Sequence, residues 1–538
     1  MHPDPLAPRR GPVLAPHAMV VASHPQATLV GVDILRTGGN AIDAAVAIAF
    51  LLTVLKPARC SLGGDLFMLV YTAADGQVTA INGSGAAPAR ATRERYAAGI
   101  PQRGLRAATV PGFVDGALVA LERFGTRSRQ ELLAPAIAAA RDGFPASLRL
   151  VQLIEAHADL LRADPSAAAV FLPGGHPPAL AAAIRQLDLA ATLTAIAEQG
   201  RDGFYEGPFA RALVAVSERA GAGFTPDDLA HHATIVREPV SASYRGLTVY
   251  EQPPVSRGFA LLEMLRILDG FELAGRDPLD PDVIHLMVEA KKIAYTDAAR
   301  DAGDPDRCAF DPQTLLAEPA IAERRARIDP RRALGEAAPA SESAACDTTS
   351  FCVVDGAGNA VAAIQSIFHP WGSGVIVPGT GVLMNNRMLG FTLEAGHPNV
   401  LEPGKRPMHT LNAYIVTRRG KPLLVGCTPG GHQQIQTNAQ ILCAVIDGGY
   451  DIQTAVDLPR WGHGDAFIED GHAVNGLALE SRIPAGVAAE LERRGHQVRY
   501  LGAWEPAMGR VTAIALDPDT DARCGAADLR GEGQAMGY

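Results

Sequence analysis

A threonine stands between a run of small polar residues and a strand-like segment in the second half of the chain. Residues 333–346 (ALGEAAPASESAAC) lack periodicity and lead through Asp347 into Thr348, Thr349 and Ser350. Such a run is typical of an interdomain linker, after which a β-branched residue ordinarily begins a strand. Alternatively, the Asp347–Thr348 peptide bond cleaves itself. Thr348 then carries a hydroxyl nucleophile and an α-amine that acts as its own base. Composition alone favours the linker.

A strong turn sequence after this junction predicts which residue faces Thr348. Residues 355–359 (DGAGN) separate two strand-like segments, 350–354 and 360–366. If the hairpin is symmetric about the middle of the turn, Thr348 lies opposite Ser366, with Cα atoms about 4.5–5.5 Å apart. The Ser366 hydroxyl would then stand beside the new amine and orient it.

A pair of glycines follows another strand-like segment. Thr428-Pro429-Gly430-Gly431-His432 comes shortly after residues 422–426 (PLLVG). Without side chains, Gly430 and Gly431 can point their N–H groups into a cleft, as an oxyanion hole for acyl transfer requires. A simple strand-to-helix turn is the alternative. Residues 371–374 (WGSG) would either close over a pocket or merely turn.

The hydrophobic patterns predict the elements that position these residues. Residues 26–35 and Ala41–Leu55 are expected to be helices, the second apolar almost all round and therefore buried. The stretch from 113 to 319 is mostly helical in pattern. After 349 the pattern changes to strands. The strands expected along the chain are 19–23, 67–73, 77–83, 247–252, 350–355, 360–366, 374–377, 381–384, 413–417 and 422–426.

Composition excludes several classes of protein. The 538 residues are 47% hydrophobic and carry a net charge of −10 without a basic stripe, so nucleic acid is not an expected partner. The N-terminal residues contain no apolar core of a signal peptide, and the apolar run 44–54 is too short to span a bilayer. Seven cysteines without a CxxC pair argue against a disulfide framework and a zinc ribbon. These features predict a cytoplasmic protein that binds no membrane.

Histidines give weaker signals. His285 and Glu289 are four residues apart on an expected helix (285–300), but no third ligand lies nearby in sequence. We interpret them as an ordinary pair and expect no metal. Among His369, His409, His432 and His463, three lie beside the motifs described above. His409 either contacts substrate or is a structural histidine.

Many short motifs, in this order and spacing, resemble the γ-glutamyltransferase (glutathione hydrolase) family of N-terminal-nucleophile hydrolases along nearly the whole chain. Each motif alone is weak, but together they are highly specific. They are 19–25 (MVVASHP), 38–44 (GGNAIDA), 63–65 (GGD), 110–112 (VPG), 304–305 (DP), 348–350 (TTS), 354–355 (VD), 358–361 (GNAV), 372–374 (GSG), 385–386 (NN), 405–407 (KRP), 429–431 (PGG), 459–461 (PRW), 527–528 (AD), Arg530 and 537–538 (GY).

This resemblance implies an α+β fold, a four-layer αββα sandwich built from two chains after self-cleavage. The cut would fall between Asp347 and Thr348. It would leave a large chain of residues 1–347 that ends in a flexible tether (about 333–347), and a small chain of residues 348–538. The linker interpretation is thereby reversed. The resemblance implies no cofactor, a small-molecule amide substrate and either water or an amine as acceptor. The two fragments would form a heterodimer that could itself dimerise.

The departures from the family pattern fall where an amino-acid head group would bind. Ser84 replaces the arginine that clamps the substrate α-carboxylate, and Phe368 replaces an asparagine. The paired acidic residues become Leu389 and Gly390, and the Ser-Ser pair becomes His409-Thr410. Losing the arginine removes a charge-assisted contact. The substrate-binding residues are therefore expected to be Ser84, Phe368, Gly390, His409 and Thr410.

We therefore predict an autocatalytically processed threonine amidohydrolase that resembles the divergent branches of the family, among them oxamate amidohydrolase and cephalosporin-acylase-like members. Thr348 is the predicted nucleophile, Ser366 orients its amine, and Gly430 and Gly431 hold the oxyanion. A small non-glutamyl amide, oxamate-type or other, is the expected substrate. One alternative is a γ-glutamyltransferase or glutathione hydrolase with a rearranged clamp. Another is an uncleaved, inactive binding protein.

Overall fold

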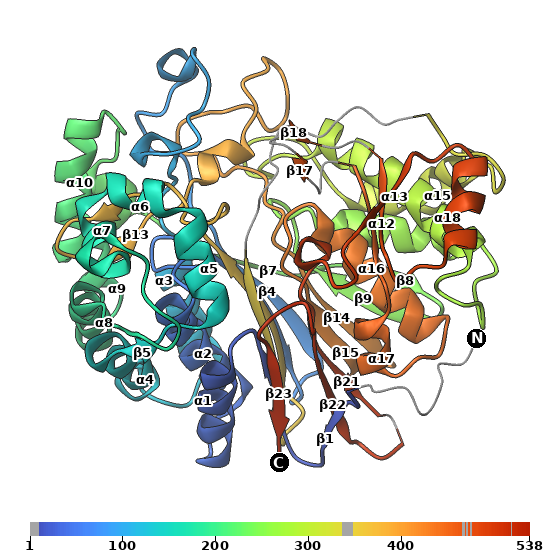
Figure 1. Cartoon of the computed structure of the whole chain (residues 1–538), viewed down its shortest axis with the longest axis horizontal. Helices are drawn as coiled ribbons and strands as arrows, with labels where there is room; N and C mark the ends of the chain where they lie inside the picture. Colours follow the sequence, from blue (N-terminus) through green and yellow to red (C-terminus); the bar gives the residue numbers. More distant parts are fainter. Residues whose placement is uncertain (1–9, 336–347, 465–467, 470–471, 474–475, 518) are drawn as a thin grey trace.

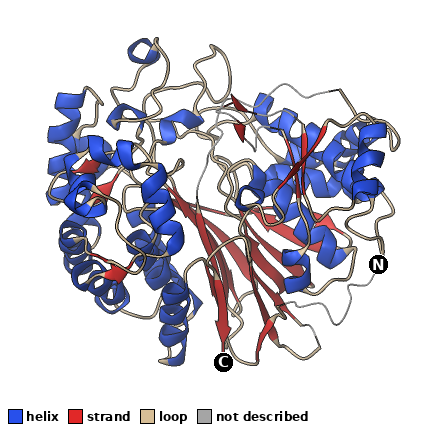
Figure 2. Cartoon of the chain, viewed as in Figure 1, coloured by secondary structure: helices blue, strands red, loops and turns tan. Residues whose placement is uncertain are grey.

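Two stacked β-sheets with helices on both outer faces form the protein (Figures 1 and 2). The computed structural model describes residues 10–335, 348–464, 468–469, 472–473, 476–517 and 519–538, so Asp347 and most of the predicted tether lie outside the described residues. Each large sheet has seven strands and is antiparallel throughout. The expected α+β fold, a four-layer αββα sandwich, is confirmed.

The first sheet carries the hairpin that begins at residue 349. Its two strands lie in the middle of the sheet, between strands that precede them in sequence. In spatial order the strands are β23 (Gln534–Gly537), β2 (Met19–Ala22), β10 (Thr349–Val354), β11 (Ala360–Ser366), β3 (Asp65–Thr72), β4 (Gln77–Gly83) and β7 (Ile235–Arg237).

The second sheet also mixes early and late segments of the chain. Strands from the first half of the sequence lie at both edges. In spatial order the strands are β1 (Val13–Ala15), β22 (Arg523–Ala527), β21 (Thr512–Leu516), β15 (Lys421–Cys427), β14 (Ala413–Arg418), β9 (Leu247–Glu251) and β8 (Val240–Tyr244). Smaller sheets pair β5 (Phe144–Pro145) with β6 (Ala183–Ile184), β12 (Ile376–Val377) with β13 (Val382–Leu383), β17 (Ile468–Glu469) with β18 (His472–Ala473), and β19 (Leu477–Glu480) with β16 (Trp461–His463) and β20 (Val498–Leu501).

One helical layer covers the outer face of the first sheet, on the left in Figure 1. Its central helix, α2 (Ala41–Leu55), is buried along its whole length, as predicted. The layer contains α1 (Pro25–Arg36), α2, α3 (Phe113–Phe124), α4 (Arg129–Asp142), α5 (Leu148–Ala156), α6 (Ala158–Ala163), α7 (Pro165–Phe171), α8 (Leu187–Gln199), α9 (Arg201–Tyr205), α10 (Pro208–Ala220) and α11 (Pro226–Ala230).

The other helical layer packs on the second sheet. The expectation of a strand-rich last part is incomplete, because three of these helices follow residue 349. The longest of the three, α16 (Gln433–Ile446), was not expected from the sequence. Its buried face is rich in glutamine and asparagine, so its apolar stripe is weak. The layer contains α12 (Phe259–Leu268), α13 (Pro281–Asp301), α14 (Gln313–Leu316), α15 (Glu318–Ala326), α16 (Gln433–Ile446), α17 (Ile452–Asp457) and α18 (Ala485–Arg493).

Asp355, in the turn between β10 and β11, couples the hairpin to the helical layer. One carboxylate oxygen accepts the Ala357 and Asn359 backbone N–H groups, and the other accepts the N–H of Ala41 at the start of α2. Asn40 caps the same helix in a reciprocal capping box with Asp43. The turn thus holds the hairpin in place against the buried helix.

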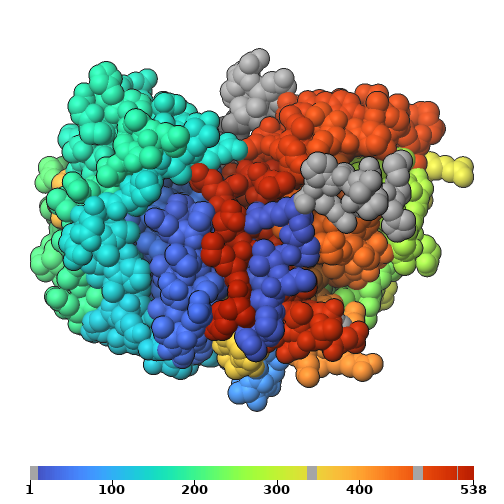
Figure 3. All heavy atoms as spheres, turned by 60° about the horizontal axis from the view of Figure 1, so that its bottom comes forward, coloured from blue at the N-terminus to red at the C-terminus, as the bar shows by residue number. Residues whose placement is uncertain are grey.

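The C-terminal strand completes the first sheet at the molecular surface. β23 pairs with β2, and Figure 3 shows the C-terminal segment (red) lying between N-terminal segments (blue). Within the described ranges, no helix is both long and apolar enough to cross a membrane.

Candidate active site

Thr348 lies at the head of β10, directly beside Ser366 of β11. The strand register pairs Thr349 with Gln365 and Ser350 with Ile364, which confirms the register predicted from the turn. The Thr348 Oγ1 hydroxyl donates a hydrogen bond to Ser366 Oγ at 3.3 Å. Both side chains are buried. The hairpin turn therefore sets the register that places these two hydroxyls side by side.

The row of facing residues continues onto a third strand. Ser366 pairs with Asp65 at the start of β3, and residues that face each other across strands project from the same side of a sheet. On β10, that side is the one from which the Cys352 thiol contacts the Thr512 carbonyl of the second sheet. Thr348, Ser366 and Asp65 therefore line one end of the space between the two sheets.

Phe368 holds the Ser366 hydroxyl through its backbone. Its N–H donates to Ser366 Oγ at 2.8 Å, so this oxygen accepts hydrogen bonds from Thr348 and Phe368. Phe368 has a φ of +80°, which is unfavourable for a bulky residue and must be stabilised by its surroundings. Its ring stacks on His369, with centroids 4.5 Å apart. The strained backbone therefore positions the hydroxyl beside Thr348.

Arg387, which the sequence reasoning missed, lies fully buried beside Phe368. Its Nε donates to Asp65 Oδ2 at 3.1 Å, and its guanidinium carbon is 4.4 Å from the Phe368 ring centroid. Burial raises the pKa of Asp65 to about 6, although Arg387 opposes that shift. Asp65 ends the motif 63–65, and Arg387 directly follows the motif 385–386. Nothing in the sequence showed that these two residues contact each other.

His409 is completely buried near this cluster. Its ring stacks against Phe67, with centroids 5.1 Å apart, and neither ring nitrogen has a hydrogen-bond partner among the described residues. Burial, followed by the charges of Arg387, Arg406 and Arg257, holds the pKa of His409 well below its ordinary value. The ring is therefore neutral, and neither its donor nor its acceptor is used by the described residues.

The Ser84 hydroxyl is bound to its own strand end. It donates to Asn82 Oδ1 at 2.6 Å, and the Ser84 carbonyl accepts from Arg406 Nε at 3.0 Å. Ser84 is fully buried. Its hydroxyl is therefore directed to Asn82, and Asp65 lies close, bonded to the adjacent Gly85 N–H.

Gly390 and Thr410 flank the segment that carries His409. A side chain at Gly390 would collide with the backbone, because its Cβ would lie 2.8 Å from the Met408 carbonyl oxygen. Thr410 is nearly buried, and its carbonyl accepts from Asn412 Nδ2 at 2.9 Å. Glycine at 390 therefore lets the 407–410 segment pack close to the site.

The predicted oxyanion loop follows β15. Gly430 and Gly431 have φ values of +142° and +55°, a backbone that glycine adopts readily. In the orientation that satisfies its hydrogen bonds, Gln434 accepts from the Gly431 N–H at 3.3 Å and donates to the Thr410 carbonyl at 2.7 Å. The Thr428 hydroxyl is held by Asn438 Oδ1 at 2.7 Å. A buried amide thus connects the glycine loop to the 409–410 segment.

Comparison with known proteins identifies the family of this arrangement. A family model described as Gamma-glutamyltranspeptidase matches residues 27–538. The chain belongs to the γ-glutamyltranspeptidase family. It is 37% identical over 530 residues to a glutathione hydrolase-like YwrD proenzyme of Bacillus subtilis, covering 98% of this chain and 99% of that protein.

Two further similar proteins are named for other activities than glutathione hydrolysis. The oxamate amidohydrolase proenzyme of Klebsiella pneumoniae is 35% identical over 535 residues, covering 97% of this chain and 98% of that protein. A crystal structure of cephalosporin acylase from Bacillus halodurans has a TM-score of 0.91 at 34% identity and covers 100% of this chain and 99% of that chain. This γ-glutamyltranspeptidase-family member is a hydrolase of the N-terminal-nucleophile class, in which a threonine nucleophile is typical.

An opening of about 430 Å³, a volume that includes space continuous with the surface, reaches Thr348 in this family member. Pro429 of the glycine loop and Thr512 of β21 line it together with Thr348. Thr348 and the start of the predicted oxyanion loop therefore border one opening. Its basic side chains were not anticipated from the sequence.

The other histidines lie outside this opening. His369 bonds to Asn386 Nδ2 at 2.9 Å, and burial, followed by the charges of Arg103 and Arg387, lowers its pKa to about 4. His463 lies 3.4 Å from the Lys291 ammonium of α13. Burial, followed by the charges of Arg257 and Lys291, lowers the pKa of His432 to about 3.

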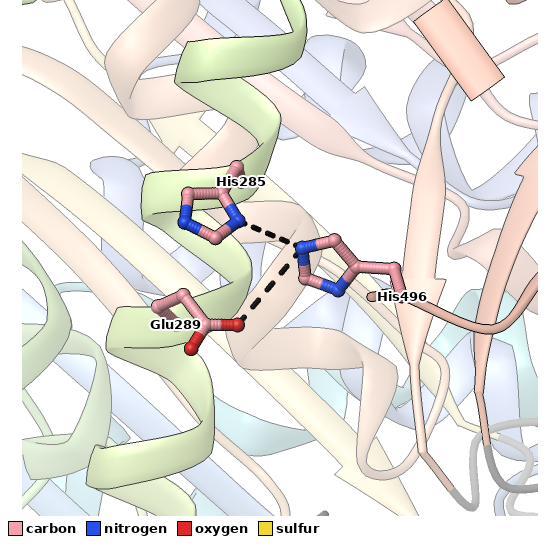
Figure 4. A group of neighbouring side chains, drawn as sticks. All are labelled: His285, Glu289 and His496. Carbon is pink, nitrogen blue, oxygen red and sulfur yellow. Dashed lines mark hydrogen bonds and ion pairs between the residues drawn. The ribbon is translucent and has the colours of Figure 1, made fainter. Parts of the chain in front are cut away.

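His285 and Glu289 gain a third neighbour, His496, that was not visible in the sequence (Figure 4). Because His285 Nε2 donates to the Asp329 carbonyl, its Nδ1 is the acceptor for His496 Nε2 at 2.8 Å. Glu289 receives the Lys292 ammonium at 2.7 Å and the Leu334 N–H at 2.7 Å. These bonds hold residues 329–334, which lead toward the predicted cleavage point.

Proposed function

We propose that this chain is a proenzyme that cleaves its own Asp347–Thr348 bond and then hydrolyses a small, non-glutamyl amide through a threonine ester. The observation that carries the proposal is the 3.3 Å contact between Thr348 Oγ1 and Ser366 Oγ at the head of β10. The glycine loop lines the same opening through Pro429. A nucleophile, a positioning hydroxyl and backbone N–H groups for an oxyanion are thus supplied by neighbouring elements.

Maturation and turnover use the same hydroxyl. In maturation, Thr348 Oγ attacks the Asp347 carbonyl carbon, the peptide C–N bond breaks, and an ester forms. Water hydrolyses this ester and leaves a free α-amine on Thr348. In turnover, the α-amine takes the hydroxyl proton as Thr348 Oγ adds to the substrate carbonyl, and then delivers that proton to the leaving amine. Water hydrolyses the acyl ester, so that acid and amine are released and Thr348 is restored.

The glycine loop supplies the oxyanion contact in this scheme. Backbone N–H groups aimed at the developing negative charge are typically worth about 2.7–4 kcal/mol each. The Gly431 N–H binds Gln434 in the uncleaved chain, so it must release or share that bond when the tetrahedral intermediate forms. Gln434 therefore couples the oxyanion loop to the 409–410 segment beside the acyl group.

The enclosed side of the site supports an acyl group with an anionic end. Arg387 presents a guanidinium beside Phe368, and His409 offers an unfilled donor and acceptor. A carboxylate bound there would form charge-assisted hydrogen bonds in desolvated surroundings. Asp65 already accepts from Arg387 and Gly85, so it is a poor partner for a substrate ammonium. Oxamate and short dicarboxylic monoamides meet this requirement, whereas a γ-glutamyl group adds an ammonium that lacks a carboxylate.

One observation favours the alternative of a γ-glutamyl enzyme with a rearranged clamp. Asp65 and Arg387 form a fully buried ion pair, one strand beyond Ser366. A γ-glutamyl head group could insert between them, with its carboxylate on Arg387 and its ammonium on Asp65. The ion pair between Asp65 and Arg387 would then be broken, but both charges of the head group would have a partner of opposite charge.

A substrate panel separates these proposals. Purified protein is examined on a denaturing gel, and the smaller band is sequenced from its N-terminus. It is then assayed with oxamate, succinamate, butyramide and γ-glutamyl-p-nitroanilide. We expect a band beginning Thr-Thr-Ser-Phe, hydrolysis of oxamate or succinamate, and little activity on butyramide or the γ-glutamyl substrate. An intact chain that hydrolyses amides would contradict the mechanism, and preference for the γ-glutamyl substrate would establish the rearranged clamp.

A further inference from the structure

Two histidines and a glutamate share a small buried space beside α13. His285 and Glu289 lie one turn apart on this helix, and His496 reaches them from the segment that follows α18 (Figure 4). All three side chains are buried. The sequence offered only two ligands here, and the fold supplies the third. Two imidazoles and a carboxylate are a common set of ligands for zinc.

The end of α18 fixes the position of His496. The Gly495 N–H donates to the Glu492 carbonyl at 2.9 Å, and the His496 N–H donates to the Leu491 carbonyl at 3.1 Å. These two bonds form a Schellman motif, in which Gly495 adopts a φ of +99° that suits glycine. The helix stop therefore directs the His496 ring toward α13.

The backbone beside His285 selects the tautomer that presents a ligand atom. The Asp329 carbonyl can only accept a hydrogen bond, so His285 Nε2 carries the proton and Nδ1 keeps its lone pair. A ring nitrogen held by a backbone carbonyl in this way is usual for metal-binding histidines. His285 Nδ1 lies 2.8 Å from His496 Nε2. The proton between these two nitrogens is the one that a metal ion would displace.

The spacing of the three ligand atoms suits a single ion. The two ring nitrogens and a Glu289 carboxylate oxygen all lie within 4.8 Å of one another. Ligand atoms of a tetrahedral Zn²⁺ are about 3.4 Å apart, because each lies about 2.1 Å from the metal. The separation of 2.8 Å between the nitrogens and that of 4.0 Å between His496 Nε2 and Glu289 Oε1 bracket this value. Small side-chain rotations would therefore bring all three atoms into contact with one ion.

Lys292 opposes metal binding at this cluster. Its ammonium donates to Glu289 Oε1 at 2.7 Å and to the Leu334 carbonyl at 3.0 Å. The carboxylate oxygen has a second lone pair, so it can accept this bond and also bind a metal. The two positive charges would repel each other. Lys292 should therefore weaken the site without abolishing it.

An opening beside the cluster gives a route from solvent. Its volume of about 1100 Å³ includes space continuous with the surface, and Leu286, Pro330 and Arg494 are among its lining residues. Leu286 follows His285 in sequence, and Arg494 is two residues from His496. The cluster therefore lies near the wall of this opening.

We propose that His285, Glu289 and His496 bind one divalent transition-metal ion, with water as the fourth ligand. This ligand set suits Zn²⁺ and also accepts Co²⁺ or Ni²⁺, whereas Mg²⁺ and Ca²⁺ prefer oxygen ligands. As the nitrogen–metal bond forms, His496 Nε2 releases its proton to solvent. The inference does not depend on the amide hydrolysis proposed above. If the Asp347–Thr348 bond is cleaved, the ion joins the two fragments, because His496 belongs to residues 348–538.

Metal loading of the purified chain, prepared without a polyhistidine tag, tests the proposal. The protein is dialysed against a chelator and then loaded with Zn²⁺ or Co²⁺. The metal content, the visible spectrum of the Co²⁺ form and the Tm with and without metal are measured. We expect one equivalent of bound metal, a spectrum typical of tetrahedral Co²⁺ and a higher Tm with metal, because an ion that binds only the folded chain stabilises it. A wild-type chain that retains no metal would overturn the proposal.

Three variants locate the ion. His496→Gln keeps an N–H that can donate to His285 Nδ1 but lacks the imidazole ligand, so metal affinity should fall by at least about 100-fold while the metal-free Tm changes little. Lys292→Met removes the competing charge and should tighten binding about 10-fold or more. His231→Gln, at an exposed histidine that ends α11, is the control and should bind metal as the wild type does.

The remaining outcomes contradict the assignment. Metal binding that survives His496→Gln would mean an adventitious ion held elsewhere on the chain. Weaker binding in Lys292→Met would show that the ion does not contact Glu289. A Tm that falls in His496→Gln, together with a wild-type chain that binds no metal, would reduce the cluster to a hydrogen-bonded pair of histidines.

Discussion

Two regions near Thr348, one enclosed and one open, present positive charge in different physical settings. On the enclosed side, Arg387 is fully buried and fixed by Asp65 and Phe368. On the open side, the partly exposed Arg149 and Arg510 border the opening at Thr348. Coulomb interactions are several-fold stronger in a desolvated pocket than at a hydrated surface, where salt also screens them. The enclosed side should therefore have the larger effect on which acyl group reacts.

The largest effect is expected for the variant that lacks the Thr348 hydroxyl. Thr348→Ala should stay full length, because no hydroxyl remains to attack the Asp347 carbonyl. Its amide hydrolysis should fall by on the order of 10⁴-fold or more, as when other covalent enzymes lose their nucleophile. A denaturing gel and an assay of succinamate hydrolysis measure both effects. Thr348→Ser, which keeps a hydroxyl, serves as the control and should still be cleaved. Cleavage of Thr348→Ala at residue 347 would refute the assignment.

The next effect concerns Ser366, whose hydroxyl is proposed to position Thr348. Ser366→Ala removes the acceptor of the Thr348 hydrogen bond, so turnover should slow by about 10²–10⁴-fold, the usual range for general acid–base positioning. Ser366→Thr keeps the hydroxyl and should be milder. Because the α-amine acts as base, we also expect the pH profile of kcat to shift in Ser366→Ala alone. Wild-type activity in both variants would remove Ser366 from the site.

The enclosed side is tested by removing its buried ion pair as a unit. Changing Arg387 alone would leave Asp65 uncompensated, and breaking such a pair typically costs about 3–5 kcal/mol. The double variant Arg387→Gln with Asp65→Asn avoids this. It should lose about 10²-fold in kcat/KM for succinamate while butyramide hydrolysis is unchanged. Thermal unfolding checks that the fold survives. An undiminished preference for succinamate would contradict the role of Arg387.

The smallest effect on activity is expected where the family pattern suggests the largest. Ser84→Arg restores the arginine of the family's motif, but the native side chain is fully buried and bonded to Asn82, and its carbonyl bonds to Arg406. An arginine there adds bulk and like charge without an acidic partner for a substrate amine. We expect no gain on γ-glutamyl-p-nitroanilide and a lower Tm. A large gain would show that the clamp needs only this residue.

The register between Thr348 and Ser366 was predictable because a tight turn transmits local sequence directly into strand pairing. The buried helix α2 was predictable because its apolar residues surround it and Asn40 caps it. Helix α16 was not, because its buried face is polar and is satisfied by contacts with distant residues, such as the Gln433 amide with the Trp461 carbonyl.

The sequence by itself determined that Thr348 lies opposite Ser366 and pointed to the glycine loop, because each depends on residues close together in the chain or on motifs shared by the family. Only the tertiary structure decided what surrounds them. Asp65 and Arg387 are 322 residues apart, and Lys56 and Glu532 are 476 apart. No local periodicity encodes such pairs. They form because both sheets interleave strands from the two ends of the chain, which brings charges that are distant in sequence together near Thr348.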